Sequence, residues 1–340
     1  MLCRSRVEDN KNCGALLRWT AEGGCPHIGR SVPTLVILLL STAHMRSAAI
    51  LGLGCSARNL KPFQTDPTIE WCLGLPSSKH EADVVLIFGG DGTIHHHLSR
   101  LVDLKLPVLV VPSGSGNDFA RALGLRSVGD SLTAWREFCR AGNNVSAIDL
   151  GVIRPLIDPS QPPKYFCGVA GVGLDAEVTR RANDLPRWLR GHGGYALSLA
   201  PALLRFGPVP IKVSTRNGDH ANAINPDDWT VGSDQPTMLA AFANTPSYGG
   251  GMKIAPRATL DDGLLDVCVI GGVDPFKLAC MFPTVYFGRH LSIREVDYFQ
   301  TAEAKIETEF PLDVYADGEF VCRTPVEIAV QGRALRVITV

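Results

Sequence analysis

Two glycine-rich segments, each with an aspartate, contain the residue types that bind phosphate groups. The first, GGDGT at residues 89–93, directly follows an apolar run that ends at Phe88, and the second, PSGSGND at residues 112–118, directly follows the apolar run 108–111. Glycine lets the backbone approach a ligand closely, and the N–H groups at the start of a following helix point at an anion. The two segments together indicate a site for a phosphate chain.

Their aspartates, Asp91 and Asp118, suggest what accompanies the phosphates. A carboxylate beside a phosphate repels it unless a divalent cation lies between them, so the pair indicates Mg²⁺ and phosphoryl transfer. A tight strand-to-helix turn without a ligand explains either glycine segment alone equally well. Asp118 is also suited to capping a helix that begins at Phe119, and Thr93 to capping the helix after the first segment.

The elements that position these segments follow from the apolar pattern. Between Met45 and Asp149, short β-branched runs such as 46–51, 82–88 and 106–111 alternate with helical patterns. Continuous apolar runs of this length are typical of buried parallel strands, and the alternation predicts a doubly wound α/β domain. Ligands of such sheets bind at the carboxyl ends of the strands, where both glycine segments lie.

The sequence after Asp149 has a different composition and pattern. Proline and glycine become frequent and alternating apolar runs appear, which predicts a β-rich domain. Residues 188–206 are the exception, since their leucines and few helix breakers favour a helix. The chain is expected to end in two strands, 326–330 and 334–340, around a turn at Gln331-Gly332.

Composition limits the classes of function. The 340 residues suit two domains, and a net charge of −1 gives no general attraction to nucleic acid. The ten cysteines are scattered without metal-site or disulfide spacing, so we expect reduced thiols in a cytoplasmic protein. The apolar run 32–40 is too short to span a bilayer. It is either part of a signal peptide or, as we favour, of an extension outside the domains.

GGDGT at 89–93 followed by PSGSGNDFAR at 112–121 resembles the paired motifs of the diacylglycerol kinase and sphingosine kinase catalytic-domain family, which includes soluble bacterial lipid kinases. GGDGT alone is less specific because NAD kinases share it, and the GNDFAR continuation separates the two groups. Further matches to the family follow in order along the chain, at residues 171–175, 244–258, 261–266 and 317–319.

The resemblance implies a fold of class α/β plus β-rich. A doubly wound nucleotide-binding domain of the NAD kinase and diacylglycerol kinase type is expected at 45–147, completed by residues 325–340. A β-sandwich-like, lipid-binding domain is expected at 148–324, and residues 1–44 are an extension of uncertain structure.

The implied activity is ATP-dependent phosphorylation of the hydroxyl of a diacylglycerol-like or sphingoid lipid, with Mg²⁺. We expect a lipid substrate, peripheral membrane contact, no nucleic acid, and a cytoplasmic protein with transient membrane association. A homodimer is left open. Arg180, Arg181 and residues 187–190 are a candidate lipid entry surface, although arginines exposed to solvent on a packed helix explain them at least as well.

The resemblance also assigns roles by position. Glu319 corresponds to the general base that takes the proton of the lipid hydroxyl, and Asp118 to an active-site carboxylate. A structural Mg²⁺ is implied at the carboxylate of Asp262 and the main-chain carbonyls of Thr259 and Leu264. The residues implied in holding ATP are Gly89, Gly90, Asp91, Gly92, Thr93, Ile94, His95 and the hydroxyl of Ser115.

Simpler interpretations stand beside these assignments. Residues 317–318 also suit a hairpin turn and residues 261–263 a turn between strands. Relatives usually carry an Asn-Pro-x-Ser-Gly loop near the start, whereas this chain has residues 52–57 and a short path to Gly89, so the nucleotide domain looks reduced. The alternatives are an NAD kinase-like small-molecule kinase and a non-catalytic nucleotide-binding relic of a lipid kinase.

Overall fold

Four parallel strands form the first part of the sheet, and the two of them that lead into the glycine segments, β3 and β4, are rich in buried β-branched residues. The computed structural model describes residues 44–158, 160–184, 206–216 and 229–340. The strands lie in the order β2-β1-β3-β4, with the bounds β1 Arg46–Leu51, β2 Glu70–Leu73, β3 Val84–Gly89 and β4 Val108–Pro112. Every residue of β3 and β4 is buried although successive side chains point to opposite faces. Both faces of the sheet are therefore covered, as the continuous apolar runs predict.

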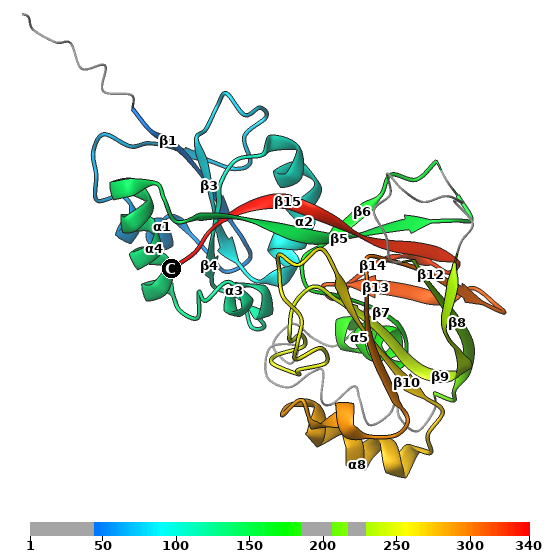
Figure 1. Cartoon of the computed structure of the whole chain (residues 1–340). Helices are drawn as coiled ribbons and strands as arrows, with labels where there is room; N and C mark the ends of the chain where they lie inside the picture. The colour runs from blue at the N-terminus through cyan, green and yellow to red at the C-terminus, as the bar shows by residue number, and fades with distance from the viewer. Residues whose placement is uncertain (1–43, 159, 185–205, 217–228) are drawn as a thin grey trace, which may run out of the picture. The chain divides into compact units, whose positions relative to one another are not determined.

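Helices cover these strands (Figure 1). They are α1 (Ala57–Leu60), α2 (Asp91–Leu104), α3 (Asp118–Ala122) and α4 (Val128–Ala141). Ser127 caps α4 by accepting a hydrogen bond from the Asp130 N–H, and Gly142 ends the helix in a left-handed conformation. Trp135 of α4 lies in the core and donates its indole N–H to the Phe63 carbonyl at 3.0 Å. These helices fix the strand ends that carry the glycine segments.

The second part of the sheet is antiparallel. Its central path runs β14-β13-β7-β9-β8-β12, and β10 pairs with β9 and β11. The bounds are β6 Lys164–Phe166, β7 Val169–Gly173, β8 Val209–Arg216, β9 Thr230–Ala243, β10 Leu265–Gly271, β11 Val296–Thr301, β12 Glu303–Thr308, β13 Asp313–Ala316 and β14 Glu319–Arg323. The alternating runs after Asp149 thus form the predicted β-rich structure.

Two long strands belong to both parts of the sheet (Figure 1). β5 (Val145–Pro155) pairs with β15 (Val326–Ile338) along most of its length, and β15 also pairs with β12 near its start and with β4 near its end. The expected turn at Gln331-Gly332 is wrong, because β15 is one strand with a register shift there. Arg333 is left-handed in this bulge and donates its N–H to the Asp149 carboxylate at 2.6 Å, so the chain continues instead of reversing.

Among the described residues, two helices pack on the antiparallel part, α5 (Leu174–Asp184) and α8 (Pro275–Val285), together with a short 3₁₀ turn at Arg289–Ser292. The sequence patterns did not predict α8. The helix expected at 188–206, the extension 1–44 and the basic residues 187–190 lie outside the described residues. Within the described part of the chain, every helix is too short or too polar to cross a membrane.

Gly151 provides a test of the packing between β5 and β6. It faces Phe166 across the two strands, and a Cβ placed on Gly151 would lie 2.0 Å from the Phe166 ring. We expect Gly151→Ala to lower the free energy of unfolding by about 1–3 kcal/mol, because the buried ring must shift. Urea unfolding measures this change. Gly207→Ala, at an exposed glycine whose Cβ would meet nothing within 4 Å, is the control and should be close to neutral.

Candidate active site

The two glycine segments lie against each other at the ends of β3 and β4. A Cβ built on Gly114 would stand 2.5 Å from the Cα of Gly90, so only glycine fits at this contact. Ser113 extends the contact by donating its N–H to the Gly89 carbonyl at 3.0 Å. Ser115 is exposed at the tip of the second segment. The result is a backbone cradle in which side chains leave room for a ligand.

The first segment includes the start of a helix. α2 begins at Asp91 with Gly90 as its N-cap, so Thr93 lies inside the first turn and the expectation that it caps the helix is wrong. The Thr93 side chain instead packs on Gly89, where a Cβ would lie 2.5 Å from its Oγ1. Ile94 is buried in the core beneath. The free N–H groups of this helix start point toward the cradle, as an anion site requires.

The Asp91 carboxylate holds the second segment. Its oxygens accept hydrogen bonds from the N–H groups of Asp118 and Phe119, at 3.0 and 3.1 Å. Asp91 therefore caps α3 from a different segment, and the alternative that Asp118 caps this helix is wrong, since α3 starts at Asp118 itself. Burial raises the pKa of Asp91 to about 6, with the nearby charge of Asp118 adding to the effect and the two N–H groups opposing it.

Asp118 connects the second segment to the antiparallel part of the sheet. One carboxylate oxygen accepts from the Arg121 guanidinium at 2.5 Å and from the Ser247 hydroxyl at 3.3 Å, and the other accepts from the Gly250 N–H at 2.8 Å. Arg121 thus pairs with its neighbour Asp118 in this structure. Asp118 is buried, so these donors supply the hydrogen bonds that a buried carboxylate needs.

Glu319 faces the first glycine segment from the far side. It begins β14, directly after a two-residue turn in which Asp317 and Gly318 have φ values of 51° and 88°. Its Oε1 lies 3.5 Å from the position that a Cβ on Gly92 would take. The side chain is exposed. The hairpin turn expected at 317–318 is present, and it points a carboxylate at the start of α2.

Asp317 was given no role by the sequence motifs, yet it holds this turn in place. Its side chain is only 2% exposed and accepts from the N–H groups of Cys167 and Gly168, at 2.9 and 2.8 Å. The His95 ring of α2 contacts the same carboxylate at 3.1 Å. Burial acts to lower the pKa of His95, but Asp317 and the charge of Glu319 outweigh it and raise that pKa. The position of Asp317 in the 317–319 motif was the available signal.

The turn expected to hold a structural Mg²⁺ is acidic and partly open. Asp262 and Thr259 are exposed, and the Asp262 carboxylate accepts from the Leu264 N–H at 3.1 Å and from Gln300 at 3.3 Å. The pKa of Asp266 beside it is raised, first by burial and also by the charge of Asp262. A carboxylate with open lone pairs in a region of excess negative charge fits a hard divalent cation.

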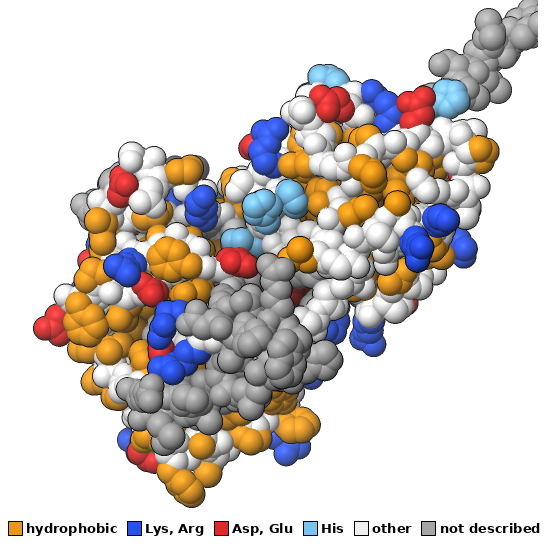
Figure 2. All heavy atoms as spheres, turned by 180° about the vertical axis from the view of Figure 1, so that it is seen from behind, with side chains coloured by type: hydrophobic (Ala, Val, Ile, Leu, Met, Phe, Trp, Pro, Cys, Tyr) orange, Lys and Arg blue, Asp and Glu red, His pale blue; other side chains and the backbone are white. Residues whose placement is uncertain are grey.

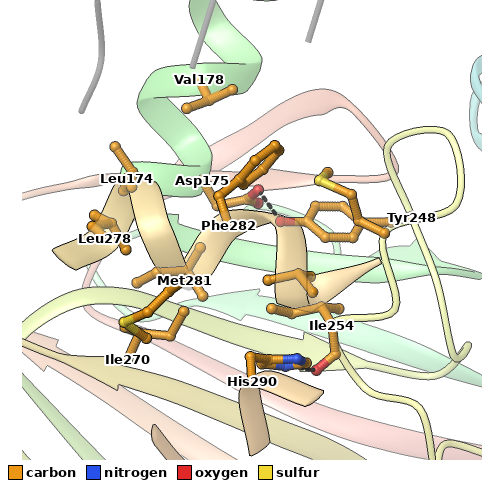
Figure 3. Close-up of a pocket in the computed structure, with 13 residues that line it drawn as sticks. Leu174, Asp175, Val178, Tyr248, Ile254, Ile270, Leu278, Met281, Phe282 and His290 are labelled. Carbon is orange, nitrogen blue, oxygen red and sulfur yellow. Dashed lines mark hydrogen bonds between the residues drawn. The ribbon is translucent and has the colours of Figure 1, made fainter. Parts of the chain in front are cut away.

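An apolar pocket lies in the antiparallel part (Figure 3). It is partly open to solvent, and its lining is mostly apolar. Its lining comes from α5, β9, β10, α8, the loop before β10 and the 3₁₀ turn at Arg289–Ser292: Leu174, Asp175, Val178, Leu239, Tyr248, Met252, Ile254, Ile270, Leu278, Met281, Phe282, Val285 and His290. The Tyr248 hydroxyl donates to the buried Asp175 carboxylate at 2.6 Å. Tyr248 belongs to the same loop as Ser247 and Gly250, which contact Asp118.

The chain matches known domains over both parts of the sheet. Residues 69–153 match the diacylglycerol kinase catalytic domain. Residues 168–339, more than half of the chain, match the YegS C-terminal NAD kinase beta sandwich-like domain. The chain belongs to the diacylglycerol kinase and YegS family of lipid kinases. Membership of this kinase family supports a phosphotransferase that uses a nucleotide, and the family resemblance drawn from the motifs is confirmed.

Relatives with assigned names agree with this family. The diacylglycerol kinase of Mycobacterium tuberculosis is 35% identical over 264 residues, which cover 75% of this chain and 76% of the relative. The diacylglycerol kinase of Bacillus subtilis is 25% identical over 260 residues, 76% of this chain and 78% of the relative. Most of each protein is therefore aligned.

Solved structures support the fold. A diacylglycerol kinase structure from Bacillus anthracis superposes with a TM-score of 0.59 at 16% identity, covering 87% of this chain and 97% of that structure. The predicted fold class is confirmed by this likeness and by the match to the sandwich-like domain.

The raised pKa of Asp91 predicts a pH-dependent stability. A carboxyl group with a folded pKa near 6 and an unfolded pKa near 3.8 binds its proton more tightly in the folded state. Its contribution to stability is therefore full below about pH 4 and is lost as the pH rises through about 6. We expect the free energy of unfolding of Asp91→Asn, relative to the unchanged protein, to rise by about 1–3 kcal/mol from pH 4 to pH 7. Urea unfolding at both pH values tests this, and a pH-independent difference would contradict it.

Proposed function

We infer that this chain is an ATP-dependent lipid kinase that phosphorylates the hydroxyl of a diacylglycerol-like or sphingoid lipid. The observation that carries the proposal is the approach of Glu319 to Gly92, within the glycine segment that starts α2. The Glu319 side chain is exposed and faces the start of α2 at the edge of the cradle. Next to a bound triphosphate, the same carboxylate is placed to activate an alcohol.

The nucleotide side of the proposal rests on the cradle. The contact of Gly90 with Gly114 removes side chains from the space above the ends of β3 and β4, where α/β sheets bind ligands. The residues that we propose to hold ATP are Gly89, Gly90, Asp91, Gly92, Thr93, Ile94, His95 and Ser115. Among them, Asp91 acts by fixing the second segment and His95 by contacting Asp317, whereas the backbone N–H groups and the Ser115 hydroxyl face the phosphates.

The reaction needs one proton acceptor and no covalent enzyme intermediate. The Glu319 carboxylate takes the proton of the lipid hydroxyl while its oxygen forms a bond to the γ-phosphorus. The bond from the γ-phosphorus to the β,γ-bridging oxygen breaks, and ADP leaves with that electron pair. Asp118, held by Arg121, Ser247 and Gly250, serves as the second active-site carboxylate and keeps the 244–258 loop at the site.

The lipid side of the proposal rests on the apolar pocket. Its walls are aliphatic and aromatic except for Asp175, Tyr248 and His290, which suits an acyl or sphingoid chain with a polar end. Burial lowers the pKa of His290, outweighing its hydrogen bond to the Ile254 carbonyl, so this ring adds no charge to the pocket at neutral pH. Tyr248 links the pocket to the loop that contacts Asp118.

Mg²⁺ is proposed in two places. One ion accompanies ATP and neutralises its phosphate charge during transfer. The other is structural, with Asp262 and the carbonyls of Thr259 and Leu264 as its protein ligands.

We further propose a nucleotide-binding domain at 45–147 with 325–340 and a lipid-binding domain at 148–324. We also propose that the protein is cytoplasmic and associates transiently with membranes.

An acceptor panel tests the function. The purified protein is incubated with ATP and Mg²⁺ and with diacylglycerol, sphingosine, ceramide or NAD, and phosphorylated product is measured in mixed micelles. We expect a lipid product and none from NAD. Glu319→Gln should fold normally and lose about 10²–10⁴-fold in turnover, because the proton acceptor is gone.

Glu309→Gln is the matched control, since Glu309 is an exposed glutamate outside the site. It should turn over like the unchanged protein. Near-normal turnover of Glu319→Gln would remove Glu319 from the role of base. Product from NAD alone would replace the lipid kinase by a small-molecule kinase, and ATP binding without any product would identify a nucleotide-binding relic.

The pocket makes a separate prediction about chain length. Leu278→Trp places a larger ring in the lining and should raise the KM for long-chain diacylglycerol about tenfold, while a short-chain diacylglycerol is affected less. Steady-state kinetics with both lipids, together with a thermal unfolding curve, measure this. Leu73→Trp, at a 65% exposed leucine on β2, is the control. Equal effects on both chain lengths would argue against an acyl chain in this pocket.

A further inference from the structure

One histidine joins two parts of the proposed site that are far apart in the sequence. Helix α2 carries the first glycine segment, and the turn at 317–318 carries Glu319. The His95 ring of α2 contacts the Asp317 carboxylate at 3.1 Å, across 222 positions of the sequence. The His95 side chain is only 16% exposed, so water competes little for this contact. The contact therefore ties the turn to the helix that forms part of the cradle.

The Asp317 carboxylate has other donors besides His95, but their charge is fixed. The N–H groups of Cys167 and Gly168 are neutral and belong to the backbone. The Cys167 thiol lies 3.5 Å from the same carboxylate, and burial raises its pKa well above the ordinary value, so it stays a neutral thiol. Among these donors, His95 is the one whose charge changes near neutral pH.

Glu319 approaches the same face of α2 as Asp317 does. Its Oε1 lies 3.5 Å from the position that a Cβ on Gly92 would take. Gly92 and His95 are three positions apart on α2, so they lie on one face of the helix. Figure 2 shows histidine side chains grouped on the surface with an acidic side chain beside them. The imidazole ring thus contacts one carboxylate of the turn and has the other one close by.

The charges around the His95 ring favour its protonated form. Burial is the largest influence and acts to lower the pKa of His95, and the Lys164 ammonium of β6 acts in the same direction. The hydrogen bond to Asp317 and the charges of Asp317 and Glu319 outweigh both, so the pKa of His95 is raised. In the protonated ring both nitrogens are donors. The charged ring attracts Glu319, and the neutral ring does not.

We propose that His95 is a positioning residue for phosphoryl transfer, whose imidazolium holds the Glu319 carboxylate at the cradle through the turn at 317–318 and through charge attraction. His95 acts on Glu319 and does not touch the reacting atoms. As far as it concerns turnover, the inference rests on the proposed function.

The sign of the pH dependence follows from the direction of the pKa shift. A group whose pKa is raised in the folded state contributes fully below its ordinary value, which is 6.5 for His95. The contribution is lost as the pH rises through the folded pKa. Loss of the proton removes the attraction to Glu319 and leaves a weaker, neutral hydrogen bond to Asp317. Turnover is therefore expected to fall on the alkaline side.

Steady-state kinetics of lipid phosphorylation from about pH 6 to about pH 9 test this role. His95→Leu removes both the charge and the bond to Asp317, and we expect about a 100-fold loss in kcat with the KM for ATP changed less than about twofold. The amide of His95→Asn can still donate to Asp317 but has no proton to lose. It should recover about tenfold of that loss and show no alkaline fall of its own.

His80→Asn is the matched control, since His80 is an exposed histidine in the loop before β3. It should keep the pH profile of the unchanged protein. An alkaline fall that persists unaltered in His95→Asn would overturn the proposal. A rise in the KM for ATP as large as the loss in kcat would also overturn it, because His95 would then act in nucleotide binding.

An NMR titration of the histidine rings in the full chain tests the pairing without any substrate. The His95 signal is identified by its absence from His95→Asn. We expect a ring pKa above 6.5 that falls by about half a pH unit in Glu319→Gln, because a negative charge beside the ring is removed. Glu309→Gln, at an exposed glutamate outside the site, should leave the pKa of His95 unchanged.

This titration also separates the inference from the proposed function. If the unchanged protein phosphorylates no lipid while Glu319→Gln still lowers the pKa of His95, the kinase function fails and the pairing of His95 with Glu319 stands. If lipid is phosphorylated but the pKa of His95 does not respond to Glu319→Gln, the kinase function stands and the positioning role of His95 is wrong.

Discussion

The contact between the backbones of Gly90 and Gly114 is the constraint on which the candidate site depends. It requires two strand ends of a parallel sheet to lie side by side with no side chain between them. The residues around the two glycines hold this contact in place and leave the space above it open. The hydrogen bond from the Ser113 N–H to the Gly89 carbonyl continues the pairing one residue beyond the strands.

Buried carboxylates join the segments around this contact by accepting hydrogen bonds across them. Asp91 of the first segment holds the start of α3, Asp118 of α3 holds the 244–258 loop, and Asp317 holds α2 through His95 and the start of β7. Each of the three lies on one segment and accepts backbone N–H groups from another, which offsets the cost of burying a charge. Glu319 alone among these acids is exposed, and it is the one proposed to react.

The sequence predicted well what depends on local pattern. The β-branched runs gave β3 and β4, and the glycine segments marked where the strands end. It could not show that Asp91 caps α3, because that bond joins residues 27 positions apart through tertiary structure. The sequence did not predict helix α8, because Pro275 and Pro283 are typical of loops and the phenylalanines are typical of strands. Packing of this segment against the pocket favours the helix over those alternatives.

One prediction based on a glycine was wrong. Gly332 is typical of a turn, but the Asp149 carboxylate accepts a hydrogen bond from the Arg333 N–H and stabilises a bulge within a single strand. The same residue types are typical of a turn and of a bulge. Which of the two forms depends on a hydrogen-bond partner that is distant in the sequence.

The placement of β15 has a consequence for how the protein is made. Val337, near the carboxyl end, pairs with Val108 of β4, so during synthesis the β4 edge waits for the whole intervening chain to emerge. An apolar strand with an open edge can pair with other chains. Pairings this distant in sequence also form slowly. Until β15 is synthesised, the nascent polypeptide therefore presents on β4 an apolar edge that is open to pairing with other chains.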